Sequence, residues 1–326
     1  MAVSHGAGLT PAPHPAVSQV RAAVRRFLHA HHSGTTVAVA CSGGPDSLAL
    51  AAATAHCAGR LDLAVHGLVV NHQLQPGSAE VAQATAETLR RLGCAEVEVL
   101  HITVTGRGGP EAAARRARYA ALREAAPAGA LVLLGHTLDD QAETVLLGLG
   151  RGSGPRSLAG MRELDPPWGR PLLGVRRTVT VAACAALDLI PWADPHNADP
   201  RFRRVRLRTE VLPLLEDVLA GGVAQALART AGQLQEDLDV LDAQACGVLA
   251  AARRDGDLDV ATLFPVPPAL RRRVLRRWLL DVRVAELTDA HLRAADDLIG
   301  RWSGQGALRL PGGVELVRTQ GRLHVC

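Results

Sequence analysis

A glycine-rich segment carries the groups in this sequence that are best suited to bind a phosphate. It consists of Ser42, Gly43, Gly44, Pro45, Asp46 and Ser47. Its glycines let the backbone approach a ligand closely, and successive N–H groups ahead of a helix N-terminus form a positive concavity that suits a phosphate group. No Gly-Lys-Ser/Thr triplet follows, so the segment is not a Walker P-loop. The alternative is a Ser-capped turn without a ligand.

The charges available to such a phosphate site are restricted. All 36 basic residues are arginine, which excludes Walker lysines, Schiff-base lysines and lysine general bases. Asp46 would repel a phosphate on its own, so we predict that it holds Mg²⁺ against a departing pyrophosphate. The formal net charge of +4 is compatible with a polyanionic partner but does not require one.

A second segment, HTLDDQAET at residues 136–144, concentrates charge at the start of a predicted helix. The spacing places His136, Asp139 or Asp140, and Glu143 along one face of that helix. Such a face would hold a cation, either a metal ion or an ammonium group, although the residue types suit zinc poorly. The alternative is that the acids only cap the helix and complement its dipole.

Two groups of arginines are candidates for binding RNA phosphates. The first comprises Arg201, Arg203, Arg204, Arg206 and Arg208, and the second Arg271, Arg272, Arg273, Arg276 and Arg277, followed by Trp278. Aromatic residues are only 2% of the chain, which argues against binding single strands mainly by base stacking. Each group is either a phosphate-binding ridge or a solvated helix face.

Alternating strand and helix patterns position both chemical segments. Apolar, strand-like runs cover residues 35–40, 61–72, 95–104 and 130–136, and helical patterns follow each of them. These four βα units predict an α/β fold with a doubly wound, mostly parallel sheet that is covered on both faces. In such folds ligands bind beyond the carboxyl ends of the strands, which is where both segments lie.

The remaining sequence suggests two domains and a flexible end. We predict a flexible N-terminus over 1–16, a larger α/β domain over 17–216, and a smaller, mainly helical domain over 217–326 that ends in a short β segment. The six cysteines include no C-x-x-C pair, so we expect buried thiols in a reducing compartment. With no signal sequence or membrane span evident, we predict a cytoplasmic protein.

The glycine-rich segment matches the S-G-G-x-D-S signature of the PP-loop ATP pyrophosphatases. Together with HTLDDQAET it resembles the tRNA(Ile)-lysidine synthase branch of that superfamily. Further matches lie at residues 71–78, 111–119, 151–161, 170–173 and 192–197. The resemblance runs from about Val37 to Leu215, with weaker support in the final β segment. Three departures are Gln75 in place of the usual Arg, Ser157 in place of Gly, and Val205 in place of Asn.

The resemblance implies a PP-loop fold of the adenine nucleotide alpha hydrolase type and a ligase activity. It also implies that the domain over 17–216 is the ATP-binding catalytic domain and that the helical domain over 217–326 binds tRNA. The expected substrates are ATP with Mg²⁺, free L-lysine, and an isoleucine tRNA with a CAU anticodon. Lysine would be joined to C2 of the wobble cytidine through an adenylated cytidine, releasing AMP and pyrophosphate. The alternatives are a PP-loop tRNA thiolase, for which paired cysteines are missing, and a catalytically idle nucleotide-binding RNA chaperone. A homodimer is left open.

The resemblance also implies roles for individual residues. Asp46, Arg115, Asp140 and Glu143 are the expected catalytic residues, and Asp139, Asp140 and Glu143 would bind lysine. The glycine-rich segment and His136 would bind ATP, and Arg204, Arg206 and Arg208 would contact tRNA. We prefer Arg115 to Arg118 because it aligns with the A-R of the family's A-R-x-x-R-Y motif. The alternative is that Arg115 is an exposed arginine on a polar helix face.

Overall fold

The computed structural model describes residues 13–32, 34–73, 77–103, 110–152, 154–195 and 199–326. Most of the predicted flexible N-terminus, Gln75, and His196 and Asn197 of a matched segment therefore lie outside the described residues. The chain forms two compact units. The first contains Met1–Gly150 and Gly160–Thr230, and the second contains Arg151–Ala159 and Ala231–Cys326.

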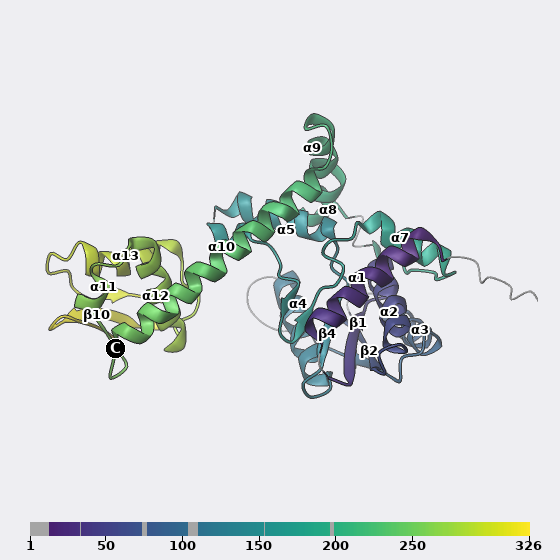
Figure 1. Cartoon of the computed structure of the whole chain (residues 1–326), viewed down its shortest axis with the longest axis horizontal. Coiled ribbons are helices and arrows are strands. Elements are labelled where there is room, and N and C mark those ends of the chain that lie inside the picture. Colours follow the sequence, from purple (N-terminus) through teal and green to yellow (C-terminus); the bar gives the residue numbers. More distant parts are fainter. Residues whose placement is uncertain (1–12, 33, 74–76, 104–109, 153, 196–198) are drawn as a thin grey trace, which may run out of the picture. The chain divides into compact units, whose positions relative to one another are not determined.

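The first unit is built on a six-stranded sheet with the order β3-β2-β1-β4-β6-β5 (Figure 1). Its strands are β1 (Thr36–Cys41), β2 (Ala64–Asn71), β3 (Glu96–His101), β4 (Leu131–Leu134), β5 (Leu164–Asp165) and β6 (Trp168–Gly169). All neighbours are parallel except β5 and β6. The predicted α/β fold with a mostly parallel sheet is confirmed, and β1 and β4 lie side by side at its centre.

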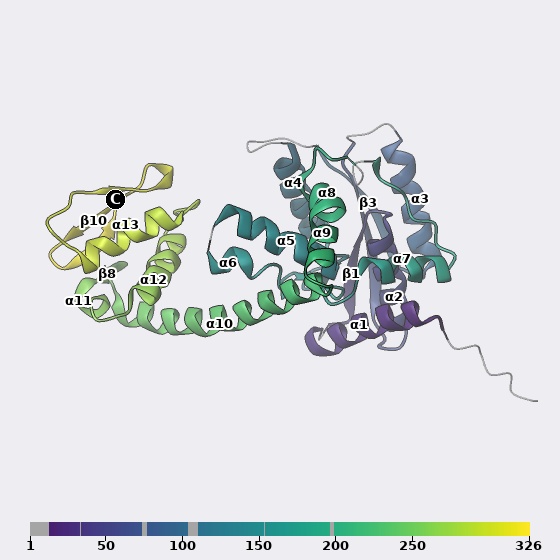
Figure 2. The same cartoon turned by 90° about the horizontal axis from the view of Figure 1, so that it is seen from above.

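Helices cover both faces of this sheet. The helices up to residue 151 are α1 (Pro15–His31), α2 (Pro45–Ala58), α3 (Ser78–Arg91), α4 (Pro110–Ala125) and α5 (Leu138–Arg151). Successive side chains of β1 lie on opposite faces of the sheet. Val37 and Val39 pack in the core with α1 and α2, whereas Ala38 packs in the core with α4. Figure 2 shows α1 and α2 together on one side of β1. A strand buried on both faces explains the continuous apolar run in the sequence.

Short helices complete the first unit. They are α7 (Arg177–Ala186), α8 (Arg203–Arg206), a π-helical turn η2 (Leu207–Val211), and α9 (Leu212–Val218). Helix α10 (Val223–Ala252) begins in this unit and continues in the second. We placed the domain boundary at 216, but Ala224 packs with Leu212 in a core cluster of the first unit. This packing explains why the compact units divide at Thr230 instead.

The second unit combines helices with a small sheet. It contains α6 (Pro155–Leu158), α11 (Val260–Leu263), α12 (Pro268–Asp281), α13 (Asp289–Gly300) and the 3-10 turn η3 (Pro311–Gly313). The strands are β7 (Arg253–Arg254), β8 (Asp257–Asp259), β9 (Leu308–Arg309), β10 (Glu315–Thr319) and β11 (Arg322–Val325). Their order is β7-β8-β11-β10-β9, so the predicted terminal β segment gains two strands that the helical pattern concealed. Trp278 lies in its core and donates to the Gly256 carbonyl.

Of the composition-based predictions, the one on cysteine burial is confirmed in part. Four cysteines are buried as expected, but Cys246 and Cys326 are exposed. Among the described residues, no single helix has the length and apolar character of a membrane span, although the bent pair Arg203–Val218 and Val223–Ala252 meets that test by length and composition.

Candidate active site

The glycine-rich segment forms the turn between β1 and α2, and Ser47 sets its shape. The Ser47 hydroxyl donates to the Gly44 carbonyl at 2.9 Å and accepts from the Ser42 amide at 3.2 Å. Gly43 has a φ of 81°, and a Cβ there would lie 2.6 Å from Thr85 Oγ1. The first amides of a helix have no partner within it. The turn therefore offers N–H groups at the start of α2 to an anion.

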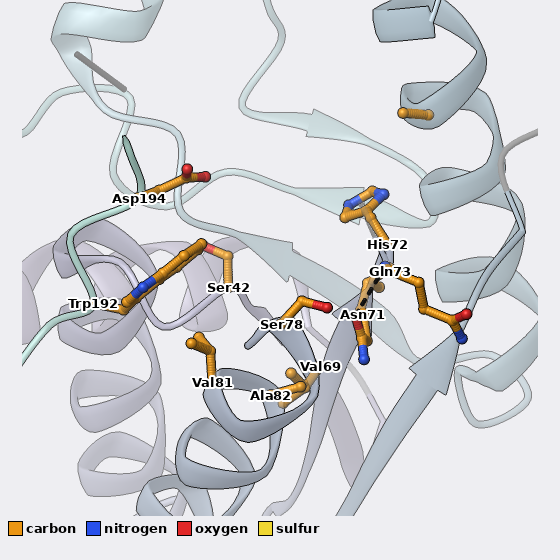
Figure 3. Close-up of a pocket in the computed structure, with 12 residues that line it drawn as sticks. Ser42, Val69, Asn71, His72, Gln73, Ser78, Val81, Ala82, Trp192 and Asp194 are labelled. Carbon is orange, nitrogen blue, oxygen red and sulfur yellow. Dashed lines mark hydrogen bonds between the residues drawn. The ribbon is translucent and has the colours of Figure 1, made fainter. Parts of the chain in front are cut away.

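Two adjoining cavities open beside this turn within the first unit. They measure about 270 and 200 Å³. Both are lined by Ser42, Val70, His72, Trp192 and Asp194. In the smaller one, Trp192 and Asp194 lie on one side of the opening and His72 on the other (Figure 3). The Trp192 amide donates to the Gly43 carbonyl at 2.9 Å, so this wall is tied to the turn. The smaller cavity has mostly apolar walls with a few polar groups, which suits a flat heterocycle, whereas the larger one is more polar.

Arg118 is the α4 arginine that lines the larger cavity. We expected Arg115 to face the site, but its side chain is exposed and donates to the Tyr119 hydroxyl at 3.1 Å. The motif thus lies on a helix that borders the cavity, but the structure places Arg118 and not Arg115 in the cavity lining, and the catalytic role of Arg115 stays a prediction. Residues three apart on a helix differ in direction by about 60°, which is enough to separate a cavity from solvent.

Gly135 holds the second segment against the first. It follows β4, and a Cβ at this position would lie 3.0 Å from backbone atoms of both Asp46 and Ser47. A glycine therefore allows the end of β4 to approach the start of α2 more closely than any other residue would. This contact places the beginning of α5 beside the glycine-rich turn.

Replacing Gly135 with alanine is expected to lower the free energy of unfolding by about 1–3 kcal/mol, because the added methyl group must displace backbone rather than a flexible side chain. Urea unfolding followed by circular dichroism would measure the change. Gly150→Ala is the matched control, since no atom lies within 4 Å of its Cβ position and it occupies α5. That substitution should be neutral or stabilising by up to about 1 kcal/mol. Equal unfolding midpoints would contradict the close approach at Gly135.

Arg177, the first residue of α7, joins the two segments through charge. Its Nε lies 3.0 Å from an Asp46 oxygen, its Nη2 lies 2.7 Å from Asp140, and its Nη1 lies 3.8 Å from Glu143. Asp46 also accepts a hydrogen bond from the Thr180 hydroxyl. One guanidinium group thus faces three carboxylates that come from the glycine-rich turn and from α5.

Asp140 and Glu143 are buried and already partnered. Asp140 accepts hydrogen bonds from the amide and the hydroxyl of Thr137, both at 2.8 Å. The fully buried Glu143 accepts from Arg208 Nε at 2.8 Å, and Arg208 also approaches Asp140 to 3.8 Å. The structure therefore brings Asp46, Asp140 and Glu143 together, and it turns Arg208, which we expected to contact RNA, toward them.

The surroundings push the pKa values of these carboxyl groups in different directions. Burial raises the pKa of Glu143, and the bond from Arg208 opposes this only in part. Burial likewise raises the pKa of Asp46 against the pull of Arg177. For Asp140, burial is outweighed by the Arg177 charge and by hydrogen bonds from Thr137, so the pKa is lowered. Among the three carboxyl groups, Asp140 therefore stays ionised to the lowest pH, while Glu143 accepts a proton more readily.

Asp139 is engaged elsewhere, although we predicted that it binds lysine with Asp140 and Glu143. Its carboxylate accepts from the Arg177 amide at 2.7 Å and from Arg176 Nε at 3.1 Å. The first bond satisfies a helix N-terminal amide of α7, and the second neutralises a neighbouring charge. Asp139 thus fixes the start of α7 and with it the position of Arg177.

Unpartnered polar atoms surround the site. Among the described residues, His72 Nδ1, His136 Nδ1 and Arg177 Nη1 are buried without a hydrogen-bond partner. Burial lowers the pKa of His136 to about 3 and also lowers the pKa of His72, so both rings are neutral near pH 7. Buried polar groups are normally satisfied, and orphaned ones beside a cavity indicate a place for a ligand.

The predicted magnesium site rests on Asp46. In the part of the chain that the structure describes, no three His, Cys, Asp or Glu side chains form a metal-binding group. Mg²⁺ in phosphate sites is commonly held by one or two carboxylates together with the phosphates of the substrate. Asp46 therefore fits an ion that arrives with a nucleotide, and it does not fit a permanent site made of protein ligands alone.

The arginines after residue 200 do not form one continuous ridge. Arg206 is exposed and pairs with Glu210 at 2.8 Å. Arg204 is half-buried. Val205, where the family usually carries Asn, is buried in the core. Of the three arginines predicted to contact tRNA, Arg204 and Arg206 remain available to solvent and Arg208 points into the carboxylate cluster.

Arg176, Arg177 and Thr180 were not among the residues predicted for this site. A signal for the arginines was present, because two positive charges at the start of an apolar helix oppose the positive end of the helix dipole. Such an arrangement requires nearby carboxylates. Asp46, Asp139 and Asp140 supply them.

Two protein families match separate segments of the chain. The PP-loop domain family matches residues 17–215, and the TilS substrate binding domain family matches residues 258–324. The first match includes both chemical segments and Arg177. The second lies within the second compact unit.

Individual relatives match almost the whole chain. It is 58% identical over 316 residues to the tRNA(Ile)-lysidine synthase of Rhodococcus jostii (strain RHA1), covering 95% of this chain and 96% of that protein. It is 55% identical to the tRNA(Ile)-lysidine synthase of Mycobacterium tuberculosis (strain ATCC 25618 / H37Rv), covering 90% of each. The solved U34-tRNA thiolase NcsA from Methanococcus maripaludis has a TM-score of 0.55 at 19% identity, covering 68% of this chain and 80% of that one. This last likeness shows a shared fold alone.

Proposed function

The chain belongs to the tRNA(Ile)-lysidine synthase family, and from this premise we propose that it joins lysine to C2 of the wobble cytidine of an isoleucine tRNA with a CAU anticodon. The reaction consumes ATP and releases AMP and pyrophosphate. One observation supports it above the others. The glycine-rich turn and a buried carboxylate cluster are held in contact through Gly135 and Arg177, so a phosphate site adjoins a site for a cationic amine.

The first step is adenylation. Cytosine O2 attacks the α-phosphorus of ATP, an O–P bond forms, and pyrophosphate leaves. The amides at the start of α2 stabilise the phosphate charge, and Arg118 is the cavity cation that can add to this stabilisation. We propose that Asp46 would hold a Mg²⁺ ion that enters with ATP, and that the ion would supply positive charge for the pyrophosphate. The neutral His136, whose Nδ1 is buried without a partner, would form a hydrogen bond with the nucleotide.

The second step is amine attack. The side-chain nitrogen of lysine forms a bond to C2, the C2–O bond breaks, and AMP leaves. An ammonium group is not a nucleophile, so it must first lose a proton. Asp140, with its lowered pKa, is suited to recognise the ammonium charge, whereas Glu143, with its raised pKa, is suited to take the proton. The incoming amine would share Glu143 with Arg208.

The thiolase alternative rests on a likeness of fold at 19% identity. The chain has no C-x-x-C pair to hold an iron–sulfur cluster or carry sulfur. The idle-chaperone alternative offers no reason for carboxylates with divergent pKa values at the edge of a phosphate-binding turn. Neither alternative requires lysine to enter the product.

Incubation with labelled lysine, ATP, Mg²⁺ and a CAU-anticodon isoleucine transcript tests the proposal. We expect label in the RNA, one AMP and one pyrophosphate per lysine, and a wobble base heavier by lysine minus water in nuclease digests. A methionine transcript with the same anticodon is the control and should take up no more than background label. AMP formation without label in the isoleucine transcript would overturn the proposal.

A further inference from the structure

A cavity of about 140 Å³ lies within the second unit, far along the chain from the glycine-rich turn. Its polar lining consists of Arg156 from α6, Asp242 and Cys246 from α10, and Arg273, Arg276 and Arg277 from α12. The α12 arginines occur at positions i, i+3 and i+4, which share one helix face. A volume several times the roughly 30 Å³ of one water molecule can hold a tetrahedral phosphate group.

The charges in this cavity are unbalanced. Asp242 is the carboxylate among its lining residues, and it accepts from Arg156 at 2.6 Å and from Arg273 at 2.8 Å. Arg277 is paired outside the lining, with Asp281 at 3.2 Å. No hydrogen bond or ion pair reaches Arg276 from any residue that the structure describes. Burial and the nearby charge of Arg156 lower the pKa of Arg276, and the charge of Asp242 opposes this only in part.

The other arginines of α12 show how this unit satisfies a structural arginine. Arg271 is buried, lies 2.7 Å from Asp296, and donates to the carbonyls of Phe264 and Val266. Arg272 lies 3.7 Å from the same carboxylate. The arginines of α12 thus fall into two sets: Arg271 and Arg272 pair with Asp296, and Arg273, Arg276 and Arg277 line the cavity. Arg276 has no equivalent of Asp296.

We propose that the cavity formed by Arg156, Arg273 and Arg276 binds a backbone phosphate of the tRNA. The planar guanidinium group of arginine can donate two parallel hydrogen bonds to phosphate oxygens. Asp242 holds the guanidinium groups of Arg156 and Arg273 in place and forms no ion pair with Arg276. The mouth is reachable by a polymer because the side chains of Arg156 and Arg277 are 41% and 63% exposed. Contacts to phosphate fix the position of an RNA but carry no sequence information, so this cavity would position the tRNA. The proposal rests on the proposed function for the identity of the RNA.

Arg276→Gln tests the pocket, with Arg293→Gln as the matched control. Arg293 is an exposed arginine of the same unit that pairs with Asp289 on α13. Binding of the isoleucine transcript to the full chain would be measured across a salt series. We expect Arg276→Gln to weaken binding about 5- to 10-fold near 0.15 M salt and to reduce the salt slope by about one ion, while Arg293→Gln changes binding less than twofold. Equal effects of both variants would overturn the proposal.

Steady-state kinetics separate this proposal from the function on which it rests. Arg276→Gln should raise KM for tRNA while KM for ATP and for lysine stays unchanged. If wild-type protein incorporates lysine and Arg276→Gln alters no parameter, the pocket proposal fails and the function stands. If the wild type incorporates no lysine but the variant still loses RNA affinity, the function fails and the pocket stands.

Cys246 provides a readout that is independent of activity. It is one of two exposed cysteines among the described residues, so a Cys326→Ser background leaves its thiol as the accessible one. The alkylation rate of Cys246 by iodoacetamide, mapped by mass spectrometry, should fall at least threefold when the transcript is bound. Protection by inorganic phosphate but not by RNA would identify a small-anion site and overturn the proposal, as would unchanged alkylation with bound RNA.

Discussion

Replacing Asp140 with alanine is expected to abolish lysine incorporation while adenylation of the tRNA continues. Asp140 lies 2.7 Å from Arg177 and is the one member of the carboxylate cluster whose pKa is lowered, so it supplies the most dependable negative charge for an ammonium group. Loss of such a charge and of the positioning it provides typically reduces a rate by about 10²–10⁴-fold. Labelled lysine incorporation measures the second step, and pyrophosphate release without lysine measures the first.

Two further variants sharpen this experiment. Asp140→Asn keeps an oxygen that can accept from Thr137 but removes the charge, so it should lose lysine incorporation as Asp140→Ala does. Asp217→Ala removes an exposed carboxylate on α9 and should retain full activity. Asp140 would be excluded from amine recognition if Asp140→Asn incorporated lysine at a normal rate, or if both steps fell by the same factor in a folded protein.

The strands and the phosphate-binding turn were predictable because their signals are local. The run at residues 35–40 begins with two threonines, continues with apolar residues and precedes a glycine-rich turn, and β1 is buried on both faces as that pattern indicates. The two short strands β5 and β6 were missed because each has only two residues, too few for a periodic pattern. The strands β7 and β8, with two and three residues, were also too short to show a periodic pattern.

The contacts that complete the site were not predictable, because they join distant parts of the chain. The sequence indicated that Asp140 and Glu143 share a helix face, but the partner of each is set by tertiary packing. Arg177 reaches Asp46 across 131 positions, and Arg208 reaches Glu143 across 65. The choice between Arg115 and Arg118 likewise depends on how α4 is rotated against the sheet, which a motif does not encode.

The absence of lysine from the chain fits the chemistry of the cluster. Guanidinium groups remain charged at all working pH values, so Arg177 and Arg208 can hold carboxylates ionised without exchanging protons with them. A substrate ammonium differs in that it can lose a proton and become a nucleophile. The permanent cations of the protein and the titratable cation of the substrate therefore have separate roles at the same carboxylates.

Arg177→Met is expected to be the most destabilising single change in this site. Three carboxylates would lose a cation that lies within 3.8 Å of each of them. Removing one partner from a buried ionic cluster commonly costs about 3–5 kcal/mol, because the remaining charges stay buried without compensation. Urea unfolding at pH 8 measures the loss. Arg176→Met is the matched control, since the neighbouring guanidinium pairs with Asp139 and is 35% exposed, and it should cost under about 1 kcal/mol.

The loss in Arg177→Met should shrink on acidification. Burial already raises the pKa values of Asp46 and Glu143, and the Arg177 charge opposes that rise. Without Arg177, the folded-state pKa values of Asp46 and Glu143 lie further above their unfolded values, and the lowered pKa of Asp140 rises as well. An acid whose pKa is raised by folding stabilises the folded state less as pH rises through that pKa, so the variant's deficit should be larger at pH 8 than at pH 5. A deficit that grows between pH 8 and pH 5 would show that Arg177 does not keep these carboxylates ionised.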